Sequence, residues 1–591
     1  MPKKSGLPPQ RTKRDLERIR ILEPVRESPS RRLKIIAQDP SILVRDSKGK
    51  PCILTASVDV PVENLAPGPR GYRVHVIDYD ASSKTLYEPK EYPDAKTDPY
   101  EKAPNRALLN DPGFHAQNVY AIVMRTLAAF EFALGRRIGW AFQSHQLQVS
   151  PHAFSIANAF YSRRDQALMF GYFTSDGTRV FTSLSHDIIA HETTHALLDG
   201  LRERYTDPSS IDQVGFHEGF ADVVAMLSVF SLPEVVSALL SSDSKLAKKK
   251  LIAKDQTTEA VLIKSALLGL GEQMGRAMPM SRGDALRRSV ELEADPTLLD
   301  QEEFIEPHRR GEVFVACMMR AFVKVWRNRL ETLGEVQPGL LHLDRVIEDG
   351  ARAAKHLMTM AIRALDYCPP TALRFNQFLT ALLIADEEIQ PDDSQHHYRD
   401  GLKESFGAFG IERLRNQWLL PEAEQNAINY RRSRFESLCR DEDEVFRFIW
   451  ENRRLLKIHE QAFTKVISVR PCMRLSPEGF YLRETVAEYI QIAYIPIGEL
   501  ALKLKRDLPA NSDEDATVKL YGGGALIFDE YGRLKYHAHN PVIEPDSDTK
   551  RLAELWDLGY FVASNETRFS RMHLARATSL PYLASRKEIS W

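Results

Sequence analysis

The residues that most constrain this chain are His191-Glu192-Thr193-Thr194-His195, which form the pattern H-E-x-x-H inside an apolar stretch. Apolar residues flank the pattern on both sides, from Ile188 to Leu198, and this predicts a buried helix. On a helix, side chains four positions apart share one face, so both imidazoles can bind a single ion. Glu192 then projects beside the metal, where its carboxylate can take a proton from water. The pattern therefore predicts a helix that carries part of a metal site.

A second motif, residues 217–222 with the sequence H-E-G-F-A-D, leads into another apolar run. A catalytic zinc site takes three protein ligands and keeps one position open for water. Glu218, which lies 23 residues after His195, can supply the third ligand from a second helix. Asp222 lies four residues further on the same face, where it can accept a hydrogen bond from the other ring nitrogen of His191 or His195. An ordinary pair of amphipathic helices with buried histidines is the alternative interpretation.

In these residues the chain resembles the thermolysin-like metallopeptidases, or gluzincins, whose third zinc ligand is a glutamate. The matching stretches are residues 187–196, D-I-I-A-H-E-T-T-H-A, and the E-x-x-x-D pattern of residues 218–222. The resemblance implies one catalytic zinc ion held by three side chains, those of His191, His195 and Glu218. It also implies that Glu192 is the general base and that Asp222 orients the first histidine.

Three further residues match the substrate-binding part of that family. Asn158 and Ala159 resemble the start of the edge strand that lines the cleft, which implies that they bind an extended substrate backbone. An unpaired strand edge offers N–H and C=O groups to a peptide. A plain strand that begins with an asparagine is the alternative. Arg287 resembles a substrate-binding arginine, with its neighbour Arg288 as a rival and a solvated basic surface as the alternative.

Two residues match groups that stabilise the oxyanion in the family. Tyr205 lies ten residues after His195, one residue short of the family's spacing. His308 comes just before a helical apolar pattern, and it matches the histidine that donates a hydrogen bond to the oxyanion. Its distance along the chain to Gly311 is also one residue short, and Glu303 or another nearby acid must replace the family's orienting aspartate. A histidine that caps a helix is the alternative for His308.

The resemblance covers residues 100–412 and implies an α+β fold with two lobes. The N-terminal lobe is expected to be rich in strands, the C-terminal lobe helical, and the active site to lie in the cleft between them. Residues 72–79 alternate in polarity as a strand does, and residues 114–135 have helical periodicity. Beyond residue 410 the resemblance stops, and we expect an additional C-terminal domain of mixed α/β structure with a hairpin at residues 529–532.

The length of the chain favours several domains, because 591 residues exceed what one hydrophobic core usually holds. The N-terminal tail, residues 1–29, carries many basic residues and lacks the apolar centre of a secretory signal, so we expect it to be disordered. The predicted organisation, in chain order, is a basic tail at 1–29, a β-rich lobe with the cleft edge strand at 30–184, a helical zinc-binding lobe at 185–411, a charged helical linker at 412–445 and a strand-rich domain at 446–591.

Composition excludes several classes of protein. The net charge of −2, from 79 basic and 81 acidic residues, argues against bulk attraction to nucleic acid. No stretch holds 18 uninterrupted apolar residues, so we expect no membrane span. The five cysteines are scattered and odd in number, which favours reduced thiols and a cytoplasmic location, unlike the secreted members of the family. Asp187 matches a calcium ligand of the family, but its acidic partners are missing, so no calcium site is predicted.

Two patterns near the C-terminus resemble ligand sites only superficially. The triple glycine at residues 522–524 lacks the spacing of a phosphate-binding loop. His537 and His539 are expected on one face of a strand, where they could touch a metal. No third ligand lies near them in the sequence, so we expect a structural role.

The function predicted from the sequence is hydrolysis of peptide bonds by a zinc-activated water, with Glu192 as general base. The expected partner is a peptide or protein substrate, and the C-terminal domain could recruit targets, cover the cleft or bind a regulatory protein. One alternative is a binding or regulatory protein on a peptidase scaffold, with little or conditional proteolysis. Another is hydrolysis of a non-peptide amide or ester. The complete ligand set with Glu192 favours the peptidase, because a pure binder need not keep a general base.

Overall fold

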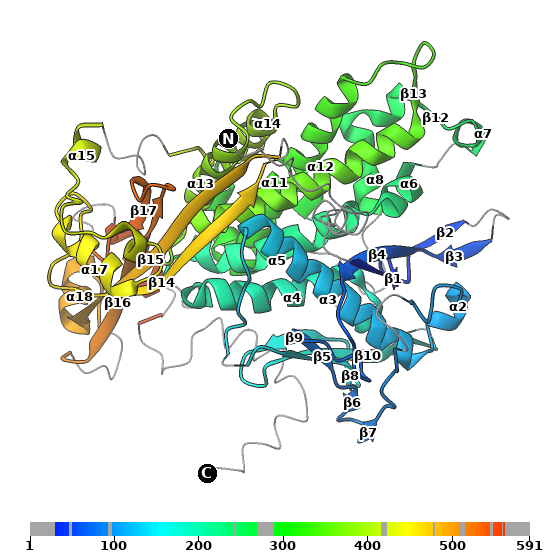
Figure 1. Cartoon of the computed structure of the whole chain (residues 1–591), viewed down its shortest axis with the longest axis horizontal. Helices are drawn as coiled ribbons and strands as arrows, with labels where there is room; N and C mark the ends of the chain where they lie inside the picture. The colour runs from blue at the N-terminus through cyan, green and yellow to red at the C-terminus, as the bar shows by residue number, and fades with distance from the viewer. Residues whose placement is uncertain are drawn as a thin grey trace, which may run out of the picture.

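A computed structural model describes the parts of the chain considered below, and they form an α+β structure (Figure 1). The α+β class predicted from the sequence is therefore confirmed. The described residues are 30–45, 50–92, 97–142, 144–175, 177–206, 209–240, 244–268, 289–414, 422–476, 479–508, 514–543, 548–557 and 560–561.

The N-terminal part of the chain is rich in strands. β1 (Ser30–Ile36) pairs antiparallel with β4 (Thr55–Pro61), and both pack against helix α3 (Pro112–Leu134). A second sheet has the order β11-β10-β8-β5, and β9 pairs with β10 beside this path. Its strands are β5 (Val74–Val76), β8 (Leu147–Phe154), β9 (Ala159–Ser162), β10 (Ala167–Ser175) and β11 (Thr178–Phe181). The short elements of this part are β2 (Leu43–Arg45), β3 (Pro51–Ile53), β6 (Tyr79–Asp80), β7 (Thr85–Leu86) and α2 (Asn105–Leu108).

Helix α3 begins and ends where the sequence supplies caps. The Asp111 side chain accepts hydrogen bonds from the N–H groups of Gly113 and Phe114, which satisfies donors at the start of the helix. Gly135, with φ of 66°, ends the helix in the left-handed conformation that glycine adopts without steric cost. The N–H of Met473 donates to the Gly135 carbonyl at 3.0 Å, so the end of α3 is joined to the C-terminal sheet.

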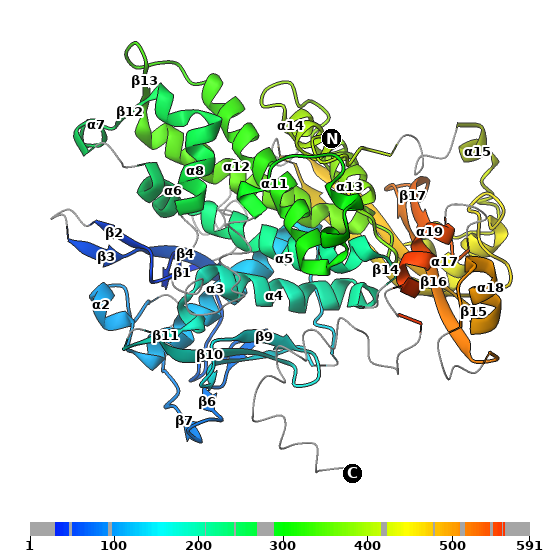
Figure 2. The ribbon, with the colours of Figure 1, turned by 180° about the vertical axis from the view of Figure 1, so that it is seen from behind.

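The middle of the chain is helical, and α5 lies at its centre in contact with α4, α11 and α12. Figures 1 and 2 show α4 and α5 between the β8–β11 sheet on one side and helices α11 to α13 on the other. The long helices are α4 (His186–Leu201), α5 (Ile211–Phe230), α11 (Pro307–Glu331), α12 (Leu343–Ala364), α13 (Phe375–Ile389) and α14 (Tyr398–Gly407). The shorter elements are α6 (Pro233–Leu240), α7 (Ser244–Lys248), β12 (Leu251–Ala253), α8 (Glu259–Leu268) and β13 (Leu340–His342).

A four-stranded antiparallel sheet of order β14-β15-β16-β17 dominates the C-terminal part. The hairpin predicted at residues 529–532 is confirmed, because it joins β16 to β17, and the Asp529 side chain accepts the N–H groups of Tyr531 and Arg533. The strands are β14 (Phe463–Leu475), β15 (Tyr481–Pro496), β16 (Thr517–Phe528) and β17 (Leu534–Asn540). The helices are α15 (Glu422–Ala427), α16 (Phe435–Leu438), α17 (Glu442–Glu451), α18 (Ile497–Leu504) and α19 (Asp548–Asp557).

The triple glycine lies inside β16 and serves close packing of the backbone. A Cβ atom at Gly523 would lie 2.3 Å from the carbonyl oxygen of Tyr489 on β15, and one at Gly522 would lie 2.5 Å from the Val542 nitrogen. Heavy atoms cannot approach so closely without displacement of the chain. These glycines are therefore explained by the strand packing around them.

The C-terminal sheet shares its hydrophobic core with the helical part of the chain. Cys472, Val486, Ala525 and Ile527 are buried in the same continuous cluster of apolar side chains as the helices α3, α4 and α5. A second, smaller cluster lies between the other face of the sheet and α17. The sheet is thus packed between two layers, one of which is the helical part itself.

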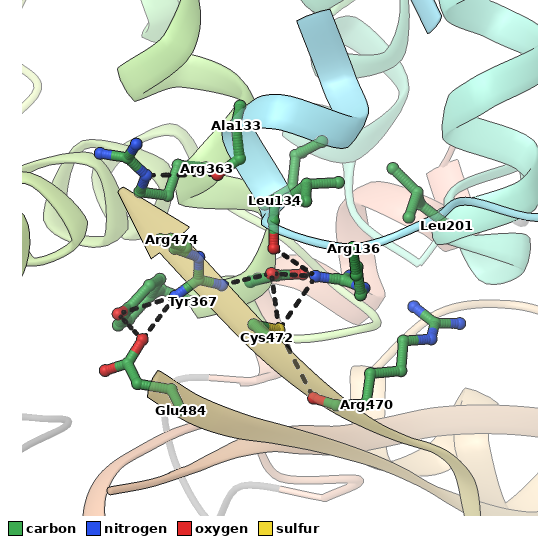
Figure 3. A network of polar contacts seen from close by, with 12 residues as sticks. Ala133, Leu134, Arg136, Leu201, Arg363, Tyr367, Arg470, Cys472, Arg474 and Glu484 are labelled. Atoms are coloured by element: carbon green, nitrogen blue, oxygen red, sulfur yellow. Dashed lines mark hydrogen bonds and ion pairs between the residues drawn. The ribbon is translucent and has the colours of Figure 1, made fainter. Parts of the chain in front are cut away.

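A buried network of charges crosses the boundary between the sheet and the helices (Figure 3). Asp366, just after α12, accepts a hydrogen bond from Arg136 at 2.6 Å and one from Arg474 of β14 at 2.5 Å. Arg474 also binds Glu484 of β15, which accepts the hydroxyl of Tyr367 at 2.6 Å. Charges removed from water are stable only when paired in this way. The network therefore fixes where β14 and β15 meet the helices.

No single helix in the described parts of the chain is both long and apolar enough to cross a membrane. Helices α5 and α6 meet that test only when taken together, and a bend of 77° separates them.

Candidate metal centre

Helix α4 places the two histidines of the H-E-x-x-H motif on one buried face. The rings of His191 and His195 lie 4.3 Å apart between centroids and are perpendicular. Both residues are almost fully buried, with exposures of 3% and 2%. At the start of the helix, the Ser185 hydroxyl donates to Asp187 at 2.6 Å, and a negative charge in the first turn is favourable for the helix dipole.

Helix α5 brings Glu218 to the same point. Its carboxylate oxygens lie 3.9 Å from Nε2 of His191 and 3.8 Å from Nε2 of His195. Ligand atoms that are ~2.0–2.1 Å from one zinc ion are at most ~4.2 Å apart, so these separations allow one ion to be bound by all three. Among the described residues, this is the one group of three or more histidine, cysteine or acidic side chains close enough to share an ion. Two imidazoles and one carboxylate form a donor set that suits zinc.

Asp222 lies one turn after Glu218 and contacts His191. Its Oδ1 atom is 2.7 Å from Nδ1 of that ring. A carboxylate at this distance keeps the proton on Nδ1, so the lone pair of Nε2 faces Glu218. Of the two histidines that the sequence left open as partners of Asp222, the structure places His191 against it.

Glu192 joins helix α4 to the edge strand β9. Its Oε2 atom accepts a hydrogen bond from the backbone N–H of Tyr161 at 3.1 Å. Its other oxygen, Oε1, lies 4.0 Å from Nε2 of His191. Glu192 as a whole is 7% exposed. Its carboxylate therefore lies between β9 on one side and the candidate ligand His191 on the other.

Strand β9 begins at the predicted edge-strand residue Ala159, directly after Asn158, and it pairs with β10 alone among the described strands. The carbonyl of Asn158 accepts the Gly171 N–H, so Asn158 points toward β10. The N–H of Tyr161 points the other way, to Glu192. Backbone groups alternate along a strand, so the carbonyl of Ala159 also faces the free edge. The N–H of Ala159 is bound by the Asn158 side chain at 2.9 Å.

Two residues near the cluster were missed by the sequence analysis. His217 is buried, and its ring stacks on that of His195 with centroids 4.7 Å apart and planes only 9° from parallel. Asp199, on the turn after His195, accepts the hydroxyl of Tyr161 at 2.9 Å. His217 stands next to Glu218 in the sequence, so its position in the motif could have indicated it. Nothing in the sequence links Asp199 to Tyr161.

His308 lies in the first turn of α11, whose backbone crosses α5 at Gly311 and Gly219. Its Nδ1 atom is 2.7 Å from Oε1 of Glu306, and burial of this carboxyl is outweighed by that hydrogen bond, which lowers the pKa of Glu306. Glu306 is therefore the acid that orients His308. Glu303, the acid named in the sequence analysis, binds Arg309 instead.

Of the other two predicted residues, the structure describes Tyr205. Tyr205 is 1% exposed, and its hydroxyl donates to the carbonyl of Pro369 at 2.9 Å. The prediction that this hydroxyl stabilises an oxyanion is thus not supported, because it is used within the core. Arg287 lies outside the described residues.

The other side chains considered as metal ligands have different partners. The Ser185 hydroxyl donates to Asp187 at 2.6 Å and lies 2.9 Å from Asp39, and burial together with Asp187 raises the pKa of Asp39. The rings of His537 and His539 stack 4.8 Å apart, and burial lowers the pKa of His539 to about 4. Neither group includes a third ligand among the described residues.

Comparison with known proteins gives no further indication, because no protein-family model and no curated protein matches the chain.

Proposed function

We propose that this protein is a zinc metallopeptidase of the thermolysin-like, or gluzincin, type, built on that family's two-lobe core. In this proposal one zinc ion is held by His191, His195 and Glu218. The β8–β11 sheet belongs to the N-terminal lobe, and α4, α5 and α11 belong to the helical lobe. The substrate is a peptide or protein whose backbone lies along the free edge of β9.

One observation carries the proposal. The Glu192 carboxylate accepts the Tyr161 N–H of β9 at 3.1 Å while its other oxygen lies 4.0 Å from Nε2 of His191. A potential general base, the candidate metal ligands and an open strand edge therefore meet at one place. A protein that only bound zinc for stability would need neither the base nor the edge.

When bound, zinc supplies a Lewis acid that polarises the scissile carbonyl and acidifies water. Glu192 accepts the proton of the attacking water and passes it to the departing amine. Asp222 keeps the Nδ1 proton of His191 in place, so Nε2 remains available as a ligand. His308 donates a hydrogen bond to the developing oxyanion. Tyr205 takes no part, because its hydroxyl is bound to Pro369.

The edge of β9 orients the substrate by main-chain hydrogen bonds. The outward carbonyl of Ala159 accepts an N–H of an extended peptide, as an added strand would provide. The Asn158 amide, which now accepts the Ala159 N–H, can turn to a substrate carbonyl. Such contacts depend on the backbone of the substrate and not on its side chains. They favour peptides over the small amides and esters that the sequence analysis kept as an alternative.

The decisive experiment compares the wild type with Glu192→Gln. Both proteins are analysed for zinc and incubated with a complex peptide mixture, and the cleavage products are identified by mass spectrometry. We expect about one zinc per chain in both and a ~10²–10⁴-fold loss of cleavage in the variant, the range that general acid–base catalysis contributes. Glu101→Gln, at an exposed position in the N-terminal part of the chain, is the control and should cleave normally.

Two results would contradict the proposal. Absence of zinc from the wild-type chain would remove the metal site, and cleavage that persists in Glu192→Gln would point to a contaminating enzyme. A zinc-loaded chain without Glu192-dependent cleavage favours the alternative, a binding or regulatory protein on a peptidase scaffold. In that case the C-terminal part of the chain would be the first to examine for a partner.

We infer that the enzyme works in a reducing compartment such as the cytoplasm. All five cysteines are free thiols, and two of them, Cys317 and Cys368, are buried where burial raises the pKa of each thiol well above its usual value. Secreted enzymes of this size commonly use disulfides. Thiol counting under denaturing, non-reducing conditions should find five per chain, and fewer would contradict this inference.

A further inference from the structure

A cavity lies in the N-terminal part of the chain, among elements that carry none of the candidate zinc ligands. Its volume is about 410 Å³. We call it the α3 pocket, because it opens beside the first turn of α3. The side chains that matter for its chemistry are those of Tyr87, Asn110, His115, His152, Arg179 and Phe181.

A chain of hydrogen bonds runs through the wall of the α3 pocket. Asp78 Oδ2 lies 2.8 Å from Nδ1 of His152, and Nε2 of His152 lies 2.7 Å from Nδ1 of His115. Nε2 of His115 then lies 3.1 Å from the carbonyl oxygen of Leu109. Both ends of this series of hydrogen bonds, the Asp78 carboxylate and the Leu109 carbonyl, are acceptors. Three protons are needed to make all three contacts hydrogen bonds, one more than two neutral imidazoles carry.

The third proton completes the contact between Asp78 and His152. His152 donates from Nε2, and His115 accepts at Nδ1 and donates from Nε2 to Leu109. Burial and the neighbouring His152 lower the pKa of His115 to about 3, in agreement with a neutral ring at that position. With three protons, Asp78 and the two imidazole rings together carry no net charge.

The pocket is walled by rings. His152 lies 4.9 Å from the ring of Tyr87 and 5.1 Å from that of Phe181, measured between centroids. The rings of Phe181 and His115 are also in edge-to-face contact, with centroids 4.7 Å apart. Such walls favour a flat apolar body, which can pack against their faces.

Arg179 supplies a charge without a carboxylate partner at the rim. Its guanidinium lies over the ring of Tyr172 at 5.3 Å and makes no ion pair among the described residues. Asp80, which accepts the hydroxyl of the same Tyr172, also accepts that of Ser83, at 2.6 Å each. Despite burial, the hydrogen bond from Ser83 lowers the pKa of Asp80, so that carboxylate is ionised at neutral pH.

These charges select the ligand. Asp78 offsets the histidine pair and Asp80 offsets Arg179, so the surroundings tolerate one added negative charge better than two. The planar guanidinium matches a carboxylate through two parallel hydrogen bonds. Asn110, which is exposed beside the pocket, offers an amide donor to the same group.

We propose that the α3 pocket is a binding site for a small aromatic carboxylate. The ring lies between Tyr87 and Phe181, and the carboxylate is held at the rim by Arg179 and Asn110. The site is separate from the proposed zinc site and does not depend on the proposed peptidase activity.

The test is titration calorimetry with benzoate at neutral pH, on the full chain with and without zinc. Benzamide, which has the same shape and no charge, and phenyl phosphate, which carries two charges, are titrated in parallel. We expect benzoate to bind at least tenfold more tightly than either and equally well without zinc. Arg179→Met should reduce benzoate affinity at least tenfold, to the level of benzamide, and Asn110→Ala should reduce it severalfold.

Arg106→Met is the matched control, because Arg106 is also an exposed arginine of this part of the chain without an ion pair among the described residues. It should bind benzoate as the wild type does. Arg179 is exposed, so its variant should melt at the wild-type temperature. The proposal is overturned if benzamide or phenyl phosphate binds as well as benzoate. It is also overturned if binding requires zinc, if Arg179→Met binds normally or if no benzoate binding is found at millimolar concentration.

Discussion

The Asp222 carboxylate lies 2.7 Å from Nδ1 of His191, on the opposite side of the ring from the nitrogen that faces Glu218. Asp222 thus orients the ring of His191 from one side, and Glu218 of the same helix faces the ring from the other side. The two acids are four residues apart, so a single helix face carries both. Two acids of α5 therefore face the two nitrogens of the His191 ring.

Removal of this contact should weaken metal binding without unfolding the chain. In Asp222→Ala the Nδ1 proton of His191 loses its acceptor, and the ring can rotate or change tautomer. Loss of such an orienting group costs ~10–100-fold in metal affinity, and we expect a change of that size in zinc titrations against a competing chelator. Asp507→Ala, at an exposed position, is the control. Equal zinc affinity in wild type and Asp222→Ala would show that the contact has no role in metal binding.

The C-terminal sheet is expected to stabilise helix α4 through Arg202. This residue ends α4, seven positions after His195, and its buried guanidinium binds Glu488 of β15 and the carbonyl of Leu365. Arg202→Met leaves Glu488 buried with only Ser468 and the more distant Arg470 as partners. Breaking a buried pair on one side costs ~3–5 kcal/mol, which urea unfolding can measure.

The double variant Arg202→Met/Glu488→Met separates the pair from its surroundings. Replacement of both charges by apolar groups is often neutral, so the double variant should recover most of the lost stability. Arg137→Met removes an ion pair with Glu131 in which the arginine is 82% exposed, and it should cost less than ~1 kcal/mol. If the losses of stability in Arg202→Met and in Glu488→Met simply added up in the double variant, this would contradict direct coupling of the two side chains across the boundary.

Acid should destabilise the protein through Asp366. Burial alone would raise the pKa of this carboxyl, but the facing guanidinium groups of Arg136 and Arg474 hold it well below its usual value. A lowered pKa in the folded state stabilises fully above the unfolded pKa of ~3.9, and this stability is lost as the pH falls toward the folded value. The free energy of unfolding should therefore decline below about pH 4.

Asp366→Asn tests the origin of that decline. At neutral pH the variant leaves two buried guanidinium groups without their carboxylate, and it should lose ~3–5 kcal/mol. Its free energy of unfolding should then change less than that of the wild type as the pH falls below 4. Asp507→Asn should follow the wild-type profile. Parallel profiles for wild type and Asp366→Asn would assign the acid sensitivity to other groups.

The sequence predicted the parts of the site that depend on local spacing. His191 and His195 share a face because they are four residues apart on one helix, and the same holds for Glu218 and Asp222. The acid beside His308 was named as Glu303 or a neighbour, and the structure has Glu306, whose side chain also caps α11 by accepting the Arg309 N–H. That contact is local and could have been derived from helix capping.

Contacts between distant segments could not be derived from spacing. The Tyr205 hydroxyl binds Pro369, which lies 164 residues away, and Arg202 binds Glu488, which lies 286 residues away. The strands of the C-terminal region could be recognised from their own residues. Where that sheet packs depends on complementary surfaces and paired charges, and these have no periodic signal along the chain.

The crossing of α5 and α11 gives the last prediction, because it lies beside the candidate metal ligand Glu218. A Cβ atom at Gly219 would lie 2.8 Å from the carbonyl oxygen of Gly311, closer than packed atoms allow. Gly219→Ala should therefore push the helices apart, lower the free energy of unfolding by ~1–3 kcal/mol and weaken zinc binding through displacement of Glu218. Gly407→Ala is the matched control, since nothing lies within 4 Å of its Cβ position at the end of α14. Alanine is the better helix former, so this control should be neutral or more stable by up to ~1 kcal/mol. Urea unfolding and zinc titration of both variants would reject the argument if Gly219→Ala matched Gly407→Ala in both measurements.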